Sequence, residues 1–145
     1  KWKGAEVIAT ASAANLDFVR SIGADKVIDY QTSRFEDFVQ GVDFVLDTVG
    51  GETLLRSMHV LKQGGRLVSV VEFPDMEVAK TLGINAIKNA VLPTSEHLRQ
   101  IVQLIEEGYA KPLIRQTFSL AEAYKAHELS ETRHGRGRIV LHITD

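Results

Sequence analysis

Residues 10–15 form the first stretch whose side chains could do chemistry; they read Thr-Ala-Ser-Ala-Ala-Asn and include no acid. They overlap the end of residues 6–11, a small and β-branched apolar run that predicts a buried strand. After such a strand in a dinucleotide-binding fold, an Asp or Glu accepts from the ribose 2′-OH and repels a 2′-phosphate. The Ser12 hydroxyl and the following helix amides can instead donate to a phosphate, which favours NADP over NAD. Ser12 also fits the N-cap of that helix, and both roles are compatible.

A second group lies after the strand predicted at residues 42–47, where Val49 precedes the pair Gly50-Gly51. Glycine at the carboxyl end of a strand permits close approach of the backbone to a ligand, but it also commonly precedes a helix. Ser69 and Val70 end the next predicted strand, where a nicotinamide would lie in such a fold. Their alternative role is simply that of core and turn residues.

Three acids, Asp43, Asp47 and Glu72, are candidates for acid–base chemistry. Asp43 begins its strand and is expected to be solvated, whereas Asp47 sits at the carboxyl end and has the better claim. A carboxylate there more often caps the next helix, so no catalytic residue is assigned. The histidines lack ligand spacing and Cys is absent, so no metal site is predicted within this stretch.

The elements that position these residues alternate between strand and helix. Strands are predicted at residues 6–11, 26–29, 42–47, 66–71, 84–92, 112–118 and 139–143, and helices at 13–22, 52–61, 94–107 and from 119 to about 130. Gly64-Gly65 is expected to end the second helix, while residues 72–82 show only a turn. This order predicts an α/β fold, a Rossmann-type parallel sheet with helices on both faces.

Only Lys1 to Gly4 precede the first predicted strand, which we therefore interpret as the second strand of a βαβ unit. The fold would then lack its first strand and Gly-rich turn, and a strip of apolar side chains would be exposed beside the gap.

Bulk composition narrows the function classes. The chain has 145 residues, 44% hydrophobic, with a net charge of −2 and scattered basic residues, which argues against a nucleic-acid partner. No apolar run approaches the ~20 residues that span a bilayer, so no membrane partner is predicted. Since no signal peptide is visible either, we expect a cytoplasmic protein.

Six segments together resemble the medium-chain dehydrogenase/reductase superfamily, in particular its NADPH-dependent quinone oxidoreductase branch. The matching segments are GAEVIATAS (4–12), SIGADKVIDY (21–30), VLDTVGG (45–51), LKQGGRLV (61–68), FSLAEAYKAH (118–127) and GRGRIVL (135–141). Each segment alone matches the superfamily only weakly, but the order and spacing of all six make the match specific.

The resemblance implies NADP as cofactor and a role for each of nine residues. Asn15 departs from a lysine that relatives place at the 2′-phosphate, and Val70 stands where many relatives have Gly. The implied contacts are Ser12, Asn15 and Tyr30 for the 2′-phosphate and adenosine, Val49 and Gly50 for the nicotinamide-side ribose, Val70 for the nicotinamide, Asn89 and Ala90 near its carboxamide, and Arg133 returning to the 2′-phosphate.

The implied function is that of the cofactor-binding part of an NADPH-dependent oxidoreductase, which reduces a quinone or enone by hydride transfer; the piece alone would be inactive. Residues 1–132 would form the partial cofactor domain and residues 133–145 a return segment to a catalytic domain. Relatives pair an edge strand across a two-fold axis, which implies a homodimer through residues 84–92. The alternatives are an S-adenosylmethionine-dependent methyltransferase, whose sheet would end in an antiparallel hairpin strand, and a non-catalytic nucleotide-binding module.

Overall fold

The computed structural model describes residues 1–89, 92–132 and 135–143. The chain divides into two compact units, Lys1–Leu92 and Pro93–Asp145. The sequence predicted another division, in which residues 133–145 return to a separate catalytic domain. That division stays a prediction.

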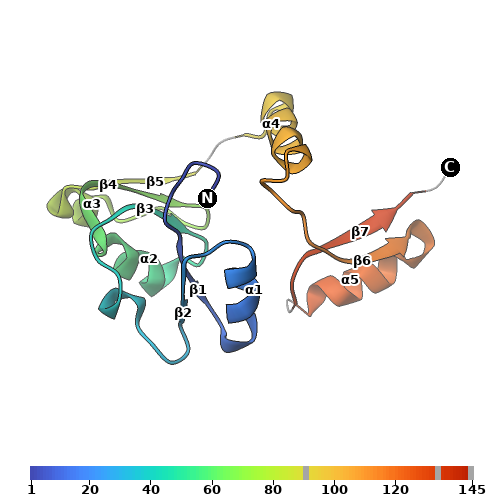
Figure 1. Ribbon diagram of the computed structural model, residues 1–145, viewed down its shortest axis with the longest axis horizontal. Helices are drawn as coiled ribbons and strands as arrows, with labels where there is room; N and C mark the ends of the chain where they lie inside the picture. The colour runs from blue at the N-terminus through green and yellow to red at the C-terminus, as the bar shows by residue number, and fades with distance from the viewer. Residues whose placement is uncertain (90–91, 133–134, 144–145) are drawn as a thin grey trace. The chain divides into compact units, whose positions relative to one another are not determined.

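The first unit contains two parallel sheets and their helices (Figure 1). Its strands and helices are β1 (Ile8–Ala11), η1 (Ala13–Asn15), α1 (Leu16–Ser21), β2 (Lys26–Asp29), η2 (Phe35–Asp37), β3 (Val42–Asp47), α2 (Gly51–Met58), β4 (Leu61–Ser69), α3 (Met76–Leu82) and β5 (Asn85–Lys88). β1 pairs with β2, and β3, β4 and β5 follow one another in the second sheet, all parallel. The predicted parallel α/β fold is confirmed.

Two apolar clusters hold this unit together. One packs α2 and α3 against β4 and β5, with Met58 and Leu67 at its centre, 1% and 0% exposed. The other joins the β1–β2 sheet to the start of β3 through Ile28, Phe35 and Val39. In Figure 1, α1 lies on one side of β1 and β2 and α2 lies on the other.

The β1–β2 sheet and the β3–β4–β5 sheet are not hydrogen-bonded to each other in the described part of the chain. On β3, Phe44 and Leu46 are 53% and 56% exposed. These two side chains therefore form an exposed apolar strip on β3.

The glycine pair at positions 64 and 65 was expected to end a helix, and this expectation is wrong. α2 ends at Met58, and the pair lies inside β4. Val42 pairs with Leu61 and Phe44 with Arg66, so residues 62–65 bulge out opposite Asp43. Gly64 has a φ of 75°, and a Cβ on Gly65 would lie 2.8 Å from the Lys62 carbonyl oxygen. The bulge therefore requires glycine at these positions.

The stretch 72–82, in which only a turn was predicted, contains α3. The helix begins because the Asp75 carboxylate accepts hydrogen bonds from the amides of Glu77 and Val78, at 2.9 and 3.1 Å. It ends at Gly83, whose φ of 65° is left-handed.

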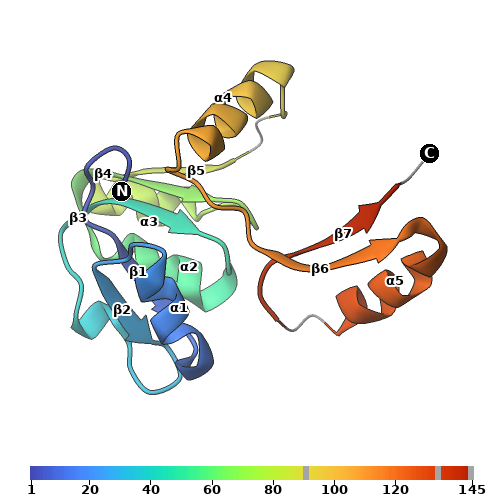
Figure 2. The ribbon, with the colours of Figure 1, turned by 45° about the vertical axis from the view of Figure 1, so that its right-hand side comes forward.

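The second unit contains α4 (Ser95–Glu106), β6 (Ile114–Ser119), η3 (Leu120–Glu122), α5 (Ala123–Glu131) and β7 (Arg138–His142). β6 and β7 are parallel and are joined through α5, with Phe118 and Ala126 buried (Figure 2). Ser119 and Glu122 form a capping box at the start of η3, where the predicted helix begins. Parallel β6 and β7 contradict the antiparallel hairpin strand of the methyltransferase alternative.

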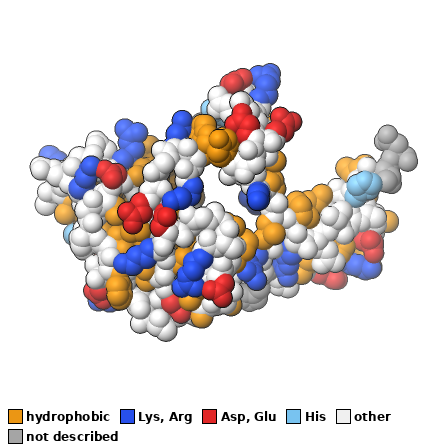
Figure 3. Space-filling model, in the orientation of Figure 1, with side chains coloured by type: hydrophobic (Ala, Val, Ile, Leu, Met, Phe, Trp, Pro, Cys, Tyr) orange, Lys and Arg blue, Asp and Glu red, His pale blue; other side chains and the backbone are white. Residues whose placement is uncertain are grey.

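Charged side chains of both signs are intermingled over the visible face (Figure 3), as the scattered charges of the sequence predict. None of the described helices is long and apolar enough to cross a membrane.

Candidate cofactor-binding site

The carboxyl ends of β1 and β2 bring together three of the predicted contacts, Ser12, Asn15 and Tyr30. The Asn15 amide donates to the Ser12 hydroxyl oxygen at 2.9 Å, and both side chains are half-buried. Ser12 occupies the N-cap position of η1, but its side chain makes no capping hydrogen bond. Asn15 therefore orients the serine, and the hydroxyl proton of Ser12 remains available to a phosphate oxygen.

The loop after β2 is tied to the loop after β1. The Tyr30 amide donates to the Ala11 carbonyl at 3.2 Å, and the Gln31 side-chain oxygen accepts from the Ala13 amide at 3.4 Å. These bonds place Tyr30 beside the loop that carries Ser12, and its side chain is 59% exposed. An exposed ring at this strand end is able to stack on a flat base.

The carboxyl ends of β3 and β4 are joined by Asp47 and Ser69, which are partners in the parallel register. Asp47 is 3% exposed and Ser69 is 0% exposed. The Ser69 hydroxyl donates to Asp47 Oδ2 at 2.7 Å, and Oδ1 accepts from the amides of Val49 and Gly50 at 3.2 and 3.0 Å. Asp47 was a candidate for acid–base chemistry, with capping of the next helix as the commoner role, and its carboxylate holds the loop that precedes α2.

Ser69 also holds the loop that follows its own strand. Its hydroxyl oxygen accepts from the amides of Val71 and Glu72, each at 3.2 Å. The Glu72 carboxylate in turn accepts from the Gly51 amide at the start of α2. The loops after β3 and β4 are thus tied together by a continuous hydrogen-bonded network.

Gly50 lies where these two loops touch. Its φ is 80°, and a Cβ there would meet Val71 Cγ1 at 3.1 Å and Glu72 Cδ at 3.2 Å. Gly50 thus lies close against the neighbouring loop, and the contact with a ligand predicted for it stays a prediction. The side chains of Val49 and Val70 are 65% and 48% exposed and form the apolar outer surface of the two loops.

Of the remaining predicted contacts, one is described. The Asn89 amide donates to the Ser69 carbonyl at 2.7 Å, so Asn89 lies beside the end of β4 and shares this edge with Asp47. Ala90 and Arg133 lie outside the described residues.

Asp43 behaves as predicted for a solvated residue at the start of a strand. It pairs with Lys62, whose hydrogen bond and charge hold the pKa of the Asp43 carboxyl below its usual range. Among the histidines, His97 has a structural role, because its Nδ1 accepts from the Thr94 amide in the capping box of α4.

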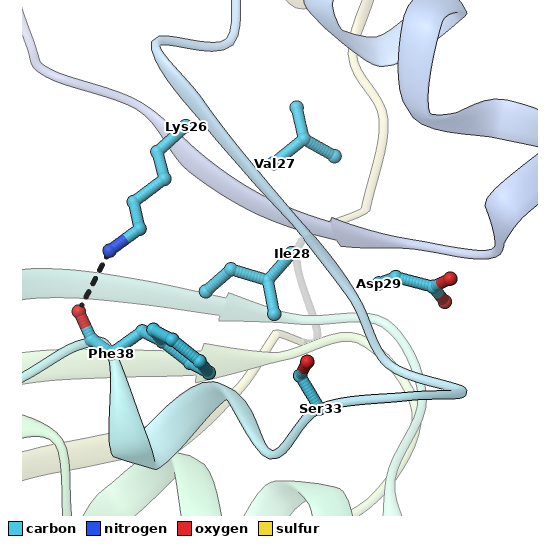
Figure 4. Close-up of a pocket in the computed structure, with 6 residues that line it drawn as sticks. All are labelled: Lys26, Val27, Ile28, Asp29, Ser33 and Phe38. Atoms are coloured by element: carbon cyan, nitrogen blue, oxygen red, sulfur yellow. Dashed lines mark hydrogen bonds between the residues drawn. The ribbon is translucent and has the colours of Figure 1, made fainter.

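A pocket of about 200 Å³ lies along β2 and the segment that follows it (Figure 4). Two of the residues that line it are hydrogen-bonded to each other: the Lys26 ammonium group donates to the Phe38 carbonyl oxygen at 3.1 Å. The pocket is lined by Lys26, Val27, Ile28, Asp29, Ser33 and Phe38. None of the nine predicted cofactor contacts lines it.

Comparison with known proteins identifies the family. The family profile described as "Zinc-binding dehydrogenase" matches residues 22–141. The chain belongs to the zinc-binding dehydrogenase family. The predicted relation to the medium-chain dehydrogenase/reductases is confirmed by the proteins that the chain resembles.

Three relatives place the chain within the zinc-binding dehydrogenase family. It is 30% identical to a "Probable zinc-binding oxidoreductase, mitochondrial" of Arthroderma benhamiae, covering 94% of this chain and 44% of that protein. It is 29% identical to the "NADPH-dependent alkenal/one oxidoreductase, chloroplastic" of Arabidopsis thaliana, covering 97% of this chain and 34% of that protein. The quinone oxidoreductase structure from Coxiella burnetii is 36% identical, with a TM-score of 0.83, over 97% of this chain and 45% of that chain. The chain therefore spans less than half the length of these relatives.

The family's description implies zinc, which His, Cys, Asp and Glu side chains hold in proteins. In residues 1–89, 92–132 and 135–143, no three His, Cys, Asp or Glu side chains gather to hold a metal ion. The described residues therefore do not fit a zinc centre.

Sequence reasoning missed the bond between Asp47 and Ser69 and the contact of Gly50 with the second loop. One signal was available, because Asp47 ends one predicted β-strand, Ser69 lies near the end of the next, and neighbouring parallel strands align their carboxyl ends at one edge.

Proposed function

We propose that the protein of which this chain is part is an NADPH-dependent oxidoreductase that transfers hydride to a quinone or enone. One observation supports the choice of NADPH: the β1 end offers an oriented Ser12 hydroxyl, held by Asn15 at 2.9 Å, in a loop without a carboxylate. Serine and amide groups can donate to a 2′-phosphate, whereas an acid in this loop would repel it.

The residues that would hold NADPH lie at the two pairs of strand ends. Ser12, Asn15 and Tyr30 would hold the adenosine half with its 2′-phosphate, and the loops that carry Gly50 and Val70 would hold the nicotinamide half. When bound, NADPH supplies the hydride, and this chain's residues bind and orient it. The exposed Val49 and Val70 side chains would exclude water from the ring.

A calorimetric titration of the full-length protein with NADPH and NADH tests the cofactor. We expect tighter binding of NADPH, and we expect Ser12→Asp to weaken it by about 1–3 kcal/mol, from a lost hydrogen bond and like-charge repulsion. Ser21→Asp is the matched control, since it adds the same charge at the other end of α1. Equal affinity for both nucleotides would show that the loop does not select the 2′-phosphate.

The substrate class is supported by the names of two relatives, the alkenal/one oxidoreductase and the quinone oxidoreductase. The full-length protein should oxidise NADPH when supplied with a quinone or an enone. Binding of NADPH without turnover on either class would favour the alternative of a non-catalytic nucleotide-binding module.

We also propose a cytoplasmic homodimer paired through residues 84–92. β5 stands at the edge of its sheet, in the order β3-β4-β5, which supports pairing through this strand. A full-length protein that sediments as a monomer at micromolar concentration would refute the dimer, and cell fractionation tests the location.

A further inference from the structure

We infer that Asp47 and Ser69 are positioning residues that set the loops after β3 and β4 in the shape that receives the nicotinamide half of the cofactor. The inference rests on the proposed function and deepens it. Neither side chain would touch the cofactor, because both are almost fully buried, at 3% and 0% exposed.

Asp47 and Ser69 accept hydrogen bonds from the backbone amides of the two loops. A buried carboxylate is costly unless hydrogen bonds compensate its lost hydration. Asp47 accepts from the amides of Val49 and Gly50 and from the Ser69 hydroxyl, and these bonds run toward the carboxyl edge. Ser69 continues the network to the amides of Val71 and Glu72. The pair therefore fixes the backbone of both loops, which is where the fold places its ligand.

The two loops are also coupled by contact. Gly50 leaves no free space toward Val71 and Glu72, because a Cβ at Gly50 would approach both within 3.2 Å. A displacement of one loop must therefore move the other. The exposed side chains of Val49 and Val70 belong to these loops. The distance between the two valines therefore depends on the buried pair of Asp47 and Ser69.

The test compares a whole cofactor with its adenosine half. The full-length protein is titrated with NADPH and with 2′,5′-ADP, as the wild type and as Asp47→Asn and Ser69→Ala. In Asp47→Asn the side-chain oxygen can still accept from the loop amides, but the amide group faces the serine as a donor. We expect each variant to bind NADPH about tenfold more weakly, while 2′,5′-ADP affinity stays within about twofold.

Leu54→Ala provides the matched control, since Leu54 is a buried core residue of α2, 4% exposed, whose side chain makes none of the network's hydrogen bonds. It should lower the stability without changing the ratio of the two affinities. If Asp47→Asn does not fold, Ser69→Ala and its ratio decide the outcome.

Three outcomes would overturn the inference. Variants that weaken both ligands equally, or neither, would show that the pair serves only the fold. A control that changes the ratio as much as Ser69→Ala would show the same. A wild-type protein that binds neither ligand would overturn the proposed function as well.

Discussion

The two pairs of strand ends at the candidate site differ in where their polar side chains lie. At the ends of β3 and β4, Asp47 and Ser69 are buried. They are hydrogen-bonded to each other and to backbone amides of the adjoining loops. At the ends of β1 and β2, Ser12 is half-buried and Tyr30 is 59% exposed. One end fixes the shape of loops, and the other presents groups that a ligand can contact.

The difference has a consequence for how the site tolerates change. Buried polar groups that satisfy one another are costly to remove, because each lost partner leaves another group unpaired. Exposed groups can be replaced with little loss of stability, so they can change ligand preference freely. We therefore expect cofactor selectivity to depend on the β1–β2 end, and loop geometry to depend on the β3–β4 end.

The largest expected effect separates two adjacent glycines. Gly50→Ala should destabilise the protein by about 2–5 kcal/mol, adding the cost of a backbone conformation that favours glycine, φ 80° and ψ −168°, to that of overlap with Val71 and Glu72. Gly51→Ala is the control, because Gly51 also has a positive φ, 57°, but nothing within 4 Å of the added Cβ. It should cost about 1–2 kcal/mol, from the conformation alone.

Denaturant unfolding of the two variants measures this difference directly. Equal losses at Gly50 and Gly51 would mean that the two loops are free to separate, and the coupling at the β3–β4 end would be lost as an explanation.

The second expected effect compares one serine from each end. Ser69→Ala removes the donor to Asp47 and the acceptor for two amides, and should cost about 1–3 kcal/mol. Ser12→Ala removes an acceptor for a half-buried Asn15 and should change the unfolding free energy by less than about 0.5 kcal/mol. Comparable losses of unfolding free energy in the two variants would show that the two pairs of strand ends do not differ in their contribution to stability.

Much of this arrangement could be predicted from the sequence, because local patterns decide it. β2 and β3 match their predicted bounds, residues 26–29 and 42–47, since short apolar runs flanked by turns allow little else. The candidate edge of the sheet followed from the same order of elements, and Ser12 and Tyr30 do come together there.

The remainder depends on contacts between distant residues. Gly64 and Gly65 have the local appearance of a helix stop, and only the register of β3 against β4 makes them a bulge. Asp75 starts α3 in a stretch where the sequence showed only the turn at Pro74. The Gly50 contact with Glu72 spans two loops, and no local pattern in either loop contains it.

The smallest expected effect concerns an ion pair between η2, which follows β2, and α2, which follows β3. Glu36 on η2, which follows β2, pairs with Arg56 on α2 at 3.0 Å, and the Arg56 guanidinium lies 4.8 Å from the Phe35 ring centroid. Burial raises the pKa of Glu36, but hydrogen bonds from its own amide and from Arg34, with the charges of Arg34 and Arg56, outweigh burial. The net pKa of Glu36 lies below its usual range.

A lowered folded-state pKa fixes the sign of the pH dependence. The ionised Glu36 stabilises the fold above the unfolded-state pKa of about 4.3, and this contribution is lost as the pH falls through the folded pKa. The pair is partly exposed to solvent, so its contribution should be at most about 1 kcal/mol.

Glu36→Gln should therefore be less stable than the wild type at neutral pH and should approach it in acid. Urea unfolding of both proteins across this pH range measures the gap. If the gap stays constant with pH, the charge of Glu36 does not strengthen the contact between η2 and α2, and the apolar cluster of Ile28 and Val39 holds the β1–β2 sheet to β3 by itself.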